Sequence, residues 1–120
     1  MRISGNGEEM NDLQLTQEVT QLHADLCFAL ADPNRILLLY ALVEQPRNVN
    51  ELSSLVGSSQ TATSRHLKML RERGLVYATR QGQSVEYTLA DPRLIEALDI
   101  LRAVLRDSLS HRAILANEFE

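Results

Sequence analysis

The chain has few of the residues that stabilise secreted proteins and no segment of the kind that crosses a membrane. Its 120 residues include one cysteine, Cys27, which excludes an intramolecular disulfide and a cysteine cage for a metal within one chain. No apolar run approaches the roughly 20 residues of a membrane-spanning helix, and residues 1–10 lack the apolar core of a signal peptide. We therefore expect a cytoplasmic protein with no membrane partner.

Features typical of enzymes are also scarce. The chain has five glycines and no glycine-rich loop that could cradle a phosphate. No combination of Ser, His and Asp, or of Cys and His, suggests a nucleophile beside its base. We therefore predict no catalytic residue, no resident metal and no cofactor.

Length and hydrophobic pattern indicate one domain behind a short tail. Residues 1–11 are rich in Ser, Gly and Asn, and we expect them to form a disordered tail. Residues 12–120, in a chain with 44% hydrophobic residues, are enough for one domain with a modest core. Apolar residues three or four apart predict a first helix over 13–30, and the almost wholly apolar residues 36–43 predict a buried central helix.

Three later helices have recognisable starts. Asp32 precedes Pro33, which suits the first position of a helix, and Asp91-Pro92 repeats this pattern before the last helix. Asn48 and Glu51 have the spacing of a capping box, in which each side chain accepts a backbone N–H from the other residue. These pairs predict helices that begin near residues 33, 49 and 92.

A short helix and a longer basic helix follow one another with almost no linker. In the short helix, Leu52, Leu55 and Val56 are expected to face inward, and Gly57 closes it. The second helix covers about residues 59–73, with Ser59 as a good N-cap. Two helices joined by a tight turn that contains glycine are typical of a helix-turn-helix.

The second helix has two faces of different chemistry. Ala62, His66, Leu67 and Leu70 form an inward stripe, whereas the opposite face is polar and basic. The whole chain has a net charge of −4, yet residues 61–82 hold five basic residues against Glu72 alone. A basic segment in an acidic chain is the electrostatic footprint of a nucleic-acid partner.

Two β-rich segments follow the basic helix. Residues 75–80 and 84–89 alternate with period 2, and Gln81-Gly82-Gln83 joins them as a hairpin. A hairpin directly after a recognition helix is a wing, and we expect its residues 80–84 to lie on the DNA backbone.

Nine residues are predicted to contact double-stranded operator DNA. On the helix, which would lie in the major groove, Arg65 suits guanine and Gln60 suits adenine. Two alternatives to base contact remain. The side chains contact phosphates alone, or they form a solvated helix face that binds no DNA. The full set is Ser59, Gln60, Thr61, Ser64, Arg65, Lys68, Arg71, Arg80 and Gln83.

The first and last helices carry apolar stripes that exceed what one small core can cover. Steps of three or four residues connect the leucines of the last helix, which we expect to continue past Ser108. A purely intramolecular core is the alternative to a homodimer. The predicted dimerisation residues are Leu15, Val19, Leu22, Leu98, Leu101 and Leu105. The expected fold is α+β and mostly α: a winged helix-turn-helix with a two-stranded β-hairpin wing and N- and C-terminal dimerisation helices.

An ordered set of motifs adds a family resemblance over roughly residues 20–105. The motifs are Phe28-Ala-Leu-Ala-Asp-Pro-Asn-Arg35, Glu51-Leu52, Ser59-Gln-Thr-Ala-Thr-Ser-Arg-His-Leu-Lys-Met-Leu-Arg71, Gly74-Leu-Val76, Arg80-Gln-Gly-Gln83 and Val85-Glu-Tyr-Thr-Leu89. Together they resemble the ArsR–SmtB family of bacterial winged-helix repressors. The resemblance implies a homodimer on an imperfect palindrome of operator DNA, and an inducer that releases the DNA. Thr63 stands where that family usually has an aliphatic residue, which we expect to be a small packing adjustment.

The inducer sites of that family are not matched. Asn48 and Asn50 stand where the family's thiol metal site has cysteines, and Asp99 and His111 lack the partners that its last-helix metal site requires. The cysteine pair of a sulfide-sensing branch is absent too, since Leu39 stands near the first position and the last helix has no cysteine. The resemblance thus carries over DNA binding and leaves the inducer unknown.

Several alternatives remain open at the level of sequence. The chain could be a metal- or redox-responsive derepressor with an unrecognised site, or a winged-helix module that binds protein. Cys27 is expected to be a buried, inert thiol, with a redox switch as the alternative. His66 is expected to be a packed histidine and not a ligand. His23 with Asp25, and His111 with Asp107, are expected to be surface residues, with an intersubunit zinc site as the alternative.

Overall fold

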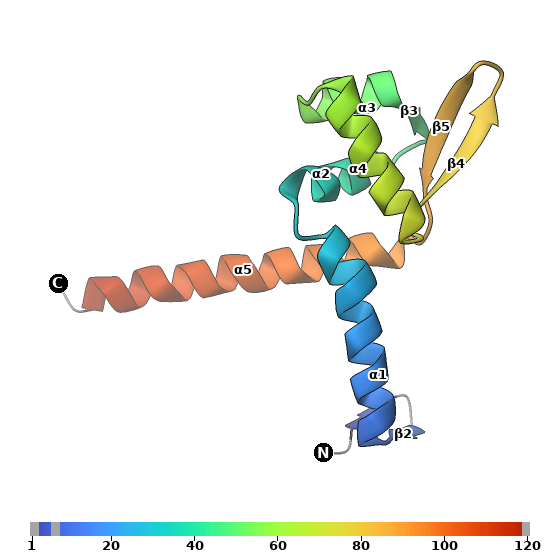
Figure 1. The fold of residues 1–120 in the computed structure, drawn as a ribbon. Coiled ribbons are helices and arrows are strands. Elements are labelled where there is room, and N and C mark those ends of the chain that lie inside the picture. Colours follow the sequence, from blue (N-terminus) through green and yellow to red (C-terminus); the bar gives the residue numbers. More distant parts are fainter. Residues whose placement is uncertain (1–2, 6–7, 119–120) are drawn as a thin grey trace. The chain divides into compact units, whose positions relative to one another are not determined.

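The computed structural model describes residues 3–5 and 8–118, and the chain forms two compact units, Met1–Ala90 and Asp91–Glu120. The first unit contains β1 to β5 and α1 to α4, and the second contains α5 (Figure 1). The molecule is mostly helical, with a three-stranded antiparallel sheet. The predicted α+β, mostly α fold class is confirmed.

The N-terminal residues lead into a long first helix. Described parts of the expected disordered tail form two short antiparallel strands, β1 (Ile3–Gly5) and β2 (Glu8–Met10). Residues 1, 2, 6 and 7 lie outside the described residues, and disorder of the tail stays a prediction. Asn11 caps α1 (Asp12–Leu22) by accepting the N–H of Gln14 at 2.7 Å.

The first helix does not remain α-helical to its end. A π-helical turn, η1 (His23–Cys27), follows α1 directly, and helical geometry continues through residue 29. The sequence predicted one helix over residues 13–30, with no sign of the wider turn. π-helical turns are rare and are often found at functional sites.

The central helix α2 (Pro33–Ala41) starts as predicted, with Asp32 accepting the N–H of Asn34. Leu38, Leu39 and Leu42 are buried, but Leu37 is 49% and Val43 is 50% exposed. The expectation that residues 36–43 form a buried central helix is therefore confirmed for one side of the helix and wrong for Leu37 and Val43. A helix of 3.6 residues per turn presents some positions outward unless it is covered on all sides.

Helix α3 (Val49–Val56) has the predicted capping box. The Asn48 side chain accepts the N–H of Glu51 at 2.9 Å, and the Glu51 carboxylate accepts the N–H of Asn48 at 3.1 Å. Leu52 is fully buried as expected, whereas Leu55 is 56% exposed, which corrects its inward assignment. Ser53 is buried instead, because the inner face of this short helix is centred on residues 52 and 53, and Leu55 lies beyond its edge.

Helix α4 (Gln60–Glu72) follows after a turn at Gly57, whose φ of 69° is left-handed. The Ser59 hydroxyl accepts the N–H of Ala62 at 3.1 Å, so the predicted N-cap is confirmed. At the other end Gly74 has a φ of 76°, and the chain turns out of the helix into the sheet. A left-handed glycine is the usual way to end a helix sharply.

The sheet contains one strand more than the sequence predicted. Strands β4 (Val76–Gln81) and β5 (Ser84–Leu89) form the expected hairpin, and β3 (Arg47–Asn48) pairs with the outer edge of β5. In register, Arg47 lies opposite Tyr87. The two residues of β3 are too few to show a period of two, which explains why the sequence predicted only the two strands of the wing.

The elements α3, α4, β4 and β5 form a winged helix-turn-helix (Figure 1). Its core is apolar, and the fully buried side chains include those of Leu38, Leu39, Leu52, Leu67 and Leu70. These residues come from α2, α3 and α4, so three helices of the first unit share one core.

The second unit consists of α5 (Arg93–Glu118), a helix of 26 residues. It starts as the Asp91-Pro92 pair predicted, because the Asp91 carboxylate accepts the N–H of Arg93 at 2.9 Å. The guanidinium of Arg93 also binds this carboxylate and lowers the pKa of Asp91 to about 2. Within residues 3–5 and 8–118, no helix has the length and apolar character needed to span a bilayer.

Candidate nucleic-acid interface

Helix α4 separates its side chains into a buried face and an exposed face. Thr63 and Leu67 are fully buried, and His66 is 8% exposed. Ala62, the first member of the predicted inward stripe, is half-buried. All seven residues of α4 and its cap that were predicted to contact DNA are exposed: Ser59, Gln60, Thr61, Ser64, Arg65, Lys68 and Arg71.

The cations of this exposed face are available for a partner. Arg65, Lys68 and Arg71 make no side-chain hydrogen bond or ion pair with another described residue, and neither does Arg80 of β4. The other described cations of the first unit, Arg35, Arg47 and Arg73, are all engaged within the protein. The available positive charge of the described part of this unit is therefore confined to α4 and the hairpin.

The buried face of α4 is attached to α2 through polar contacts. His66 Nδ1 lies 3.4 Å from Arg35 Nη1, and His66 Nε2 lies 3.9 Å from Asp32 Oδ2. The same guanidinium donates to the carbonyl oxygens of Ala29 at 2.6 Å and of Phe28 at 3.1 Å. The expectation of a packed histidine is confirmed. The role of Arg35 was missed, since an isolated arginine gives no sign in the sequence that it is buried.

The hairpin presents the predicted wing residues at its tip. Arg80 pairs with Val85 and Gln81 with Ser84, so the turn consists of Gly82 and Gln83. The loop is one residue shorter than predicted, and Gly82 has a φ of 65°, which suits a two-residue hairpin turn. Arg80 and Gln83 are both exposed.

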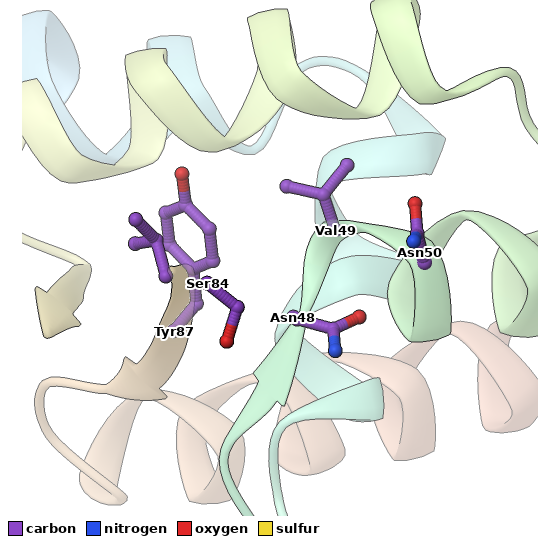
Figure 2. Close-up of a pocket in the computed structure, with 6 residues that line it drawn as sticks. Asn48, Val49, Asn50, Ser84 and Tyr87 are labelled. Carbon is purple, nitrogen blue, oxygen red and sulfur yellow. The ribbon is translucent and has the colours of Figure 1, made fainter. Parts of the chain in front are cut away.

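A cavity lies beside the wing, where the start of α3 meets β5 (Figure 2). Its volume is about 310 Å³, and it is lined by Asn48, Val49, Asn50, Ser84, Val85 and Tyr87. The positions where the resemblance would place thiol metal ligands therefore carry two carboxamides. One of these, on Asn48, is already bound to the N–H of Glu51.

The titratable residues considered as sensors do not assemble into a site in the described part of the chain. Cys27 is exposed, which corrects the expectation of a buried thiol: it lies in η1, whose wide turn changes the direction of the following side chains. His23 is exposed as well, and so are Asp107 and His111. Among residues 3–5 and 8–118, no three His, Cys, Asp or Glu side chains are close enough to hold a metal ion.

The residues predicted to mediate dimerisation are mostly uncovered. On α1, Val19 is 51% and Leu22 is 46% exposed, and Leu15 is half-buried. On α5, Leu101 is 60% and Leu105 is 56% exposed, whereas Leu98 is 5% exposed. No residue from Asp12 to Leu22 is buried, so the apolar side of α1 is at most partly covered in the described chain.

Comparison with known proteins identifies the family. The model of the bacterial regulatory protein, arsR family, matches residues 32–78. The uncharacterized HTH-type transcriptional regulator Rv0081 of Mycobacterium tuberculosis is 38% identical over 104 residues, which are 86% of this chain and 91% of that protein.

Solved structures agree with this relationship. The crystal structure of Rv0081 has a TM-score of 0.70 at 40% identity and covers 79% of this chain and 96% of that one. The homodimeric winged helix-turn-helix DNA-binding domain of Mb0332 from Mycobacterium bovis has a TM-score of 0.70 at 26% identity, covering 85% and 93%. The transcriptional repressor BigR from Xylella fastidiosa has a TM-score of 0.68 at 27% identity, covering 79% and 96%. The chain therefore belongs to the arsR family of bacterial regulatory proteins, and it is a winged helix-turn-helix transcriptional regulator and not an enzyme.

Proposed function

We propose that the protein is a cytoplasmic homodimeric repressor that binds operator DNA with α4 in the major groove and the β4–β5 hairpin on the phosphate backbone. The observation that carries this proposal is the unpaired state of Arg65, Lys68, Arg71 and Arg80 toward the other described residues. Four exposed cations on one helix and the adjacent hairpin match the charge of a DNA backbone, which supplies most of the affinity of such proteins.

The side chains of α4 have different roles in this proposal. Gln60, Arg65 and their neighbours in the first turns approach base edges, where Arg recognises guanine and Gln recognises adenine. Lys68 and Arg71 bind phosphates, which orient the helix without reading sequence. The Ser59 hydroxyl accepts the N–H of Ala62 as the N-cap and keeps its own hydrogen to donate to a phosphate. Backbone N–H groups at the start of a helix add further donors to such an anion.

The dimer is proposed from the uncovered apolar side chains of α1 and α5. Val19, Leu22, Leu101 and Leu105 are each about half exposed, which is unfavourable for so many large apolar residues in water. The related Mb0332 domain is homodimeric. We infer that residues 12–120 act as one winged-helix domain whose first and last helices pair with those of a second copy, and that, like BigR, it represses transcription.

Selection of DNA from a random duplex pool by the purified, tag-free protein tests the proposal. We expect an imperfect palindrome whose half-sites are about one helical turn apart, roughly 34–36 Å, or a multiple of it. Arg65→Ala should lose the preference at one base pair of each half-site, whereas Ser110→Glu on α5 is a control that should keep the full sequence preference. A wild-type pool with no enriched sequence would contradict the proposal and favour a winged helix that binds protein.

A further inference from the structure

We propose that Arg73 is a positioning residue and not a DNA contact: it attaches the C-terminal end of α4 to the π-helical turn η1 after α1. It would thereby orient the DNA-reading helix relative to the helix proposed to form the dimer. This inference rests on the proposed DNA-binding role of α4.

The contacts of Arg73 are concentrated on three residues of the first helix. Its Nη1 donates to the carbonyl oxygen of Ala24 at 3.3 Å and to Asp25 Oδ1 at 3.2 Å. Its guanidinium carbon lies 5.1 Å from the centre of the Phe28 ring, within the range of a cation–π interaction. A planar guanidinium can make all three contacts at once, which an ammonium group cannot do as well.

The partners of Arg73 are also held by contacts of their own. The side-chain amide of Gln21 donates a hydrogen bond to the Asp25 carboxylate. The hydrogen bonds from Gln21 and Arg73, in this order of importance, lower the pKa of Asp25. Asp25 and Ala24 lie within η1, and Phe28 directly follows this turn. The Ala24 carbonyl oxygen accepts a hydrogen bond from Arg73.

The contrast with Arg71 separates a positioning role from DNA contact. Arg71 lies two residues earlier on α4, is exposed, and has no partner among the described residues. Arg73 is the C-cap residue of α4, and its side chain is 34% exposed because it is directed to η1. It therefore contributes its charge to a contact between two helices.

This contact has a geometric consequence for the proposed repressor. Helix α1 carries Val19 and Leu22, which are proposed to meet the second copy, and η1 continues α1 without a break. A link from η1 to α4 transmits the geometry of the dimer interface to the recognition helix. Binding of two half-sites at a fixed spacing depends on that geometry.

Asp25→Ala gives the most direct test, because a purely electrostatic effect and a positioning role predict opposite changes in the affinity for DNA. Loss of a negative charge from a DNA-binding protein should by itself strengthen binding. If Asp25 holds Arg73, Asp25→Ala should instead weaken binding to the selected two-half-site operator by about fivefold, the upper range for a partly exposed ion pair. Glu18→Ala, which removes an exposed carboxylate of α1 that takes no part in the Arg73 contact, is the matched control and should not weaken binding.

Variants of Arg73 complete the test. Arg73→Ala should weaken operator binding by a similar factor, and the double variant Asp25→Ala/Arg73→Ala should be no weaker than either single variant, since coupled residues are not additive. Arg73→Lys should also bind the operator more weakly than the wild type does. Circular dichroism and sedimentation of each variant check that fold and dimer are intact.

The results that would contradict the positioning role of Arg73 differ from the result that would contradict the proposed function. If Arg73 contacted a phosphate, Arg73→Ala would reduce the slope of affinity against salt by about one, and Arg73→Lys would bind normally. Either of those results, or stronger binding by Asp25→Ala, would overturn the positioning role. Failure of the wild type to select any DNA sequence would instead overturn the proposed function itself.

Discussion

Thr63 lies one helical turn before Leu67, and both side chains are fully buried on the inner face of α4. They differ in one respect: the Thr63 hydroxyl has no hydrogen-bond partner among the described residues. A buried hydroxyl without a partner costs free energy because it has lost its water. The threonine that stands where the family resemblance expects an aliphatic residue is therefore a more costly substitution than a small packing adjustment.

Thr63→Val should stabilise the protein. Valine has nearly the shape of threonine and removes the unpaired hydroxyl, so the free energy of unfolding should rise by about 1–2 kcal/mol. Urea denaturation followed by circular dichroism measures this change. Thr79→Val, on an exposed position of β4, is the control and should change stability little. A destabilised Thr63→Val variant would mean that the hydroxyl does have a partner.

Arg65→Ala and Lys68→Ala should differ in kind. Loss of a base contact by Arg65→Ala should cost about 1–3 kcal/mol on the specific site and relax the preference at one base pair. Loss of a phosphate contact by Lys68→Ala should weaken binding to all sequences and reduce the salt slope by about one. Fluorescence anisotropy on operator and single-substituted operators separates the two. Unchanged affinity in both variants would show that these residues of α4 do not contact the DNA.

Arg80→Ala should weaken operator binding with little change in sequence preference, because a contact to phosphate carries no base information. Arg80 is exposed near the two-residue turn of Gly82 and Gln83, where it can approach the backbone beside the groove. Arg80→Lys keeps the charge and should bind almost as the wild type does. Full affinity of Arg80→Ala at physiological salt would mean that the hairpin points away from the DNA.

Arsenite and cadmium should not release the operator through the start of α3. The two positions that would need thiolates carry Asn48 and Asn50, which border the cavity beside β5. A titration of the protein–operator complex followed by anisotropy provides the measurement, with Cys27→Ser as the control. Release by stoichiometric arsenite that persists in Cys27→Ser would show that another ligand set exists.

Leu101→Glu should yield a monomer with far weaker operator binding. Leu101 is 60% exposed on α5, and covering such a leucine in a dimer contributes about 1.5–3 kcal/mol per side chain, whereas a glutamate there would bury a charge. Sedimentation at micromolar concentration measures the oligomeric state. Ser110→Glu, on the opposite face of α5, should remain dimeric. A wild type that sediments as a single monomeric species would exclude the dimer and the palindrome with it.

The local features of this protein were predictable from its sequence. The capping box of Asn48 and Glu51, the N-cap of Ser59 and the helix start at Asp32 involve residues within three positions of one another. The short joint at Gly57 and the basic outer face of α4 follow from the same kind of local pattern. Such contacts depend on backbone geometry that is common to all helices, so the order of residues along the chain was enough to assign the helix-turn-helix and its wing.

Tertiary structure alone decided the features that depend on distant residues. The strand β3 exists because two residues, Arg47 and Asn48, meet the edge of β5. Leu55 is exposed because the inner face of α3 is centred on residues 52 and 53, and Cys27 is exposed in the π-helical turn η1. Arg73 looks like Arg71 in the sequence, but its partner Asp25 lies 48 residues away. Sequence patterns report the face on which a side chain lies, whereas burial and pairing depend on what the folded chain brings to that face.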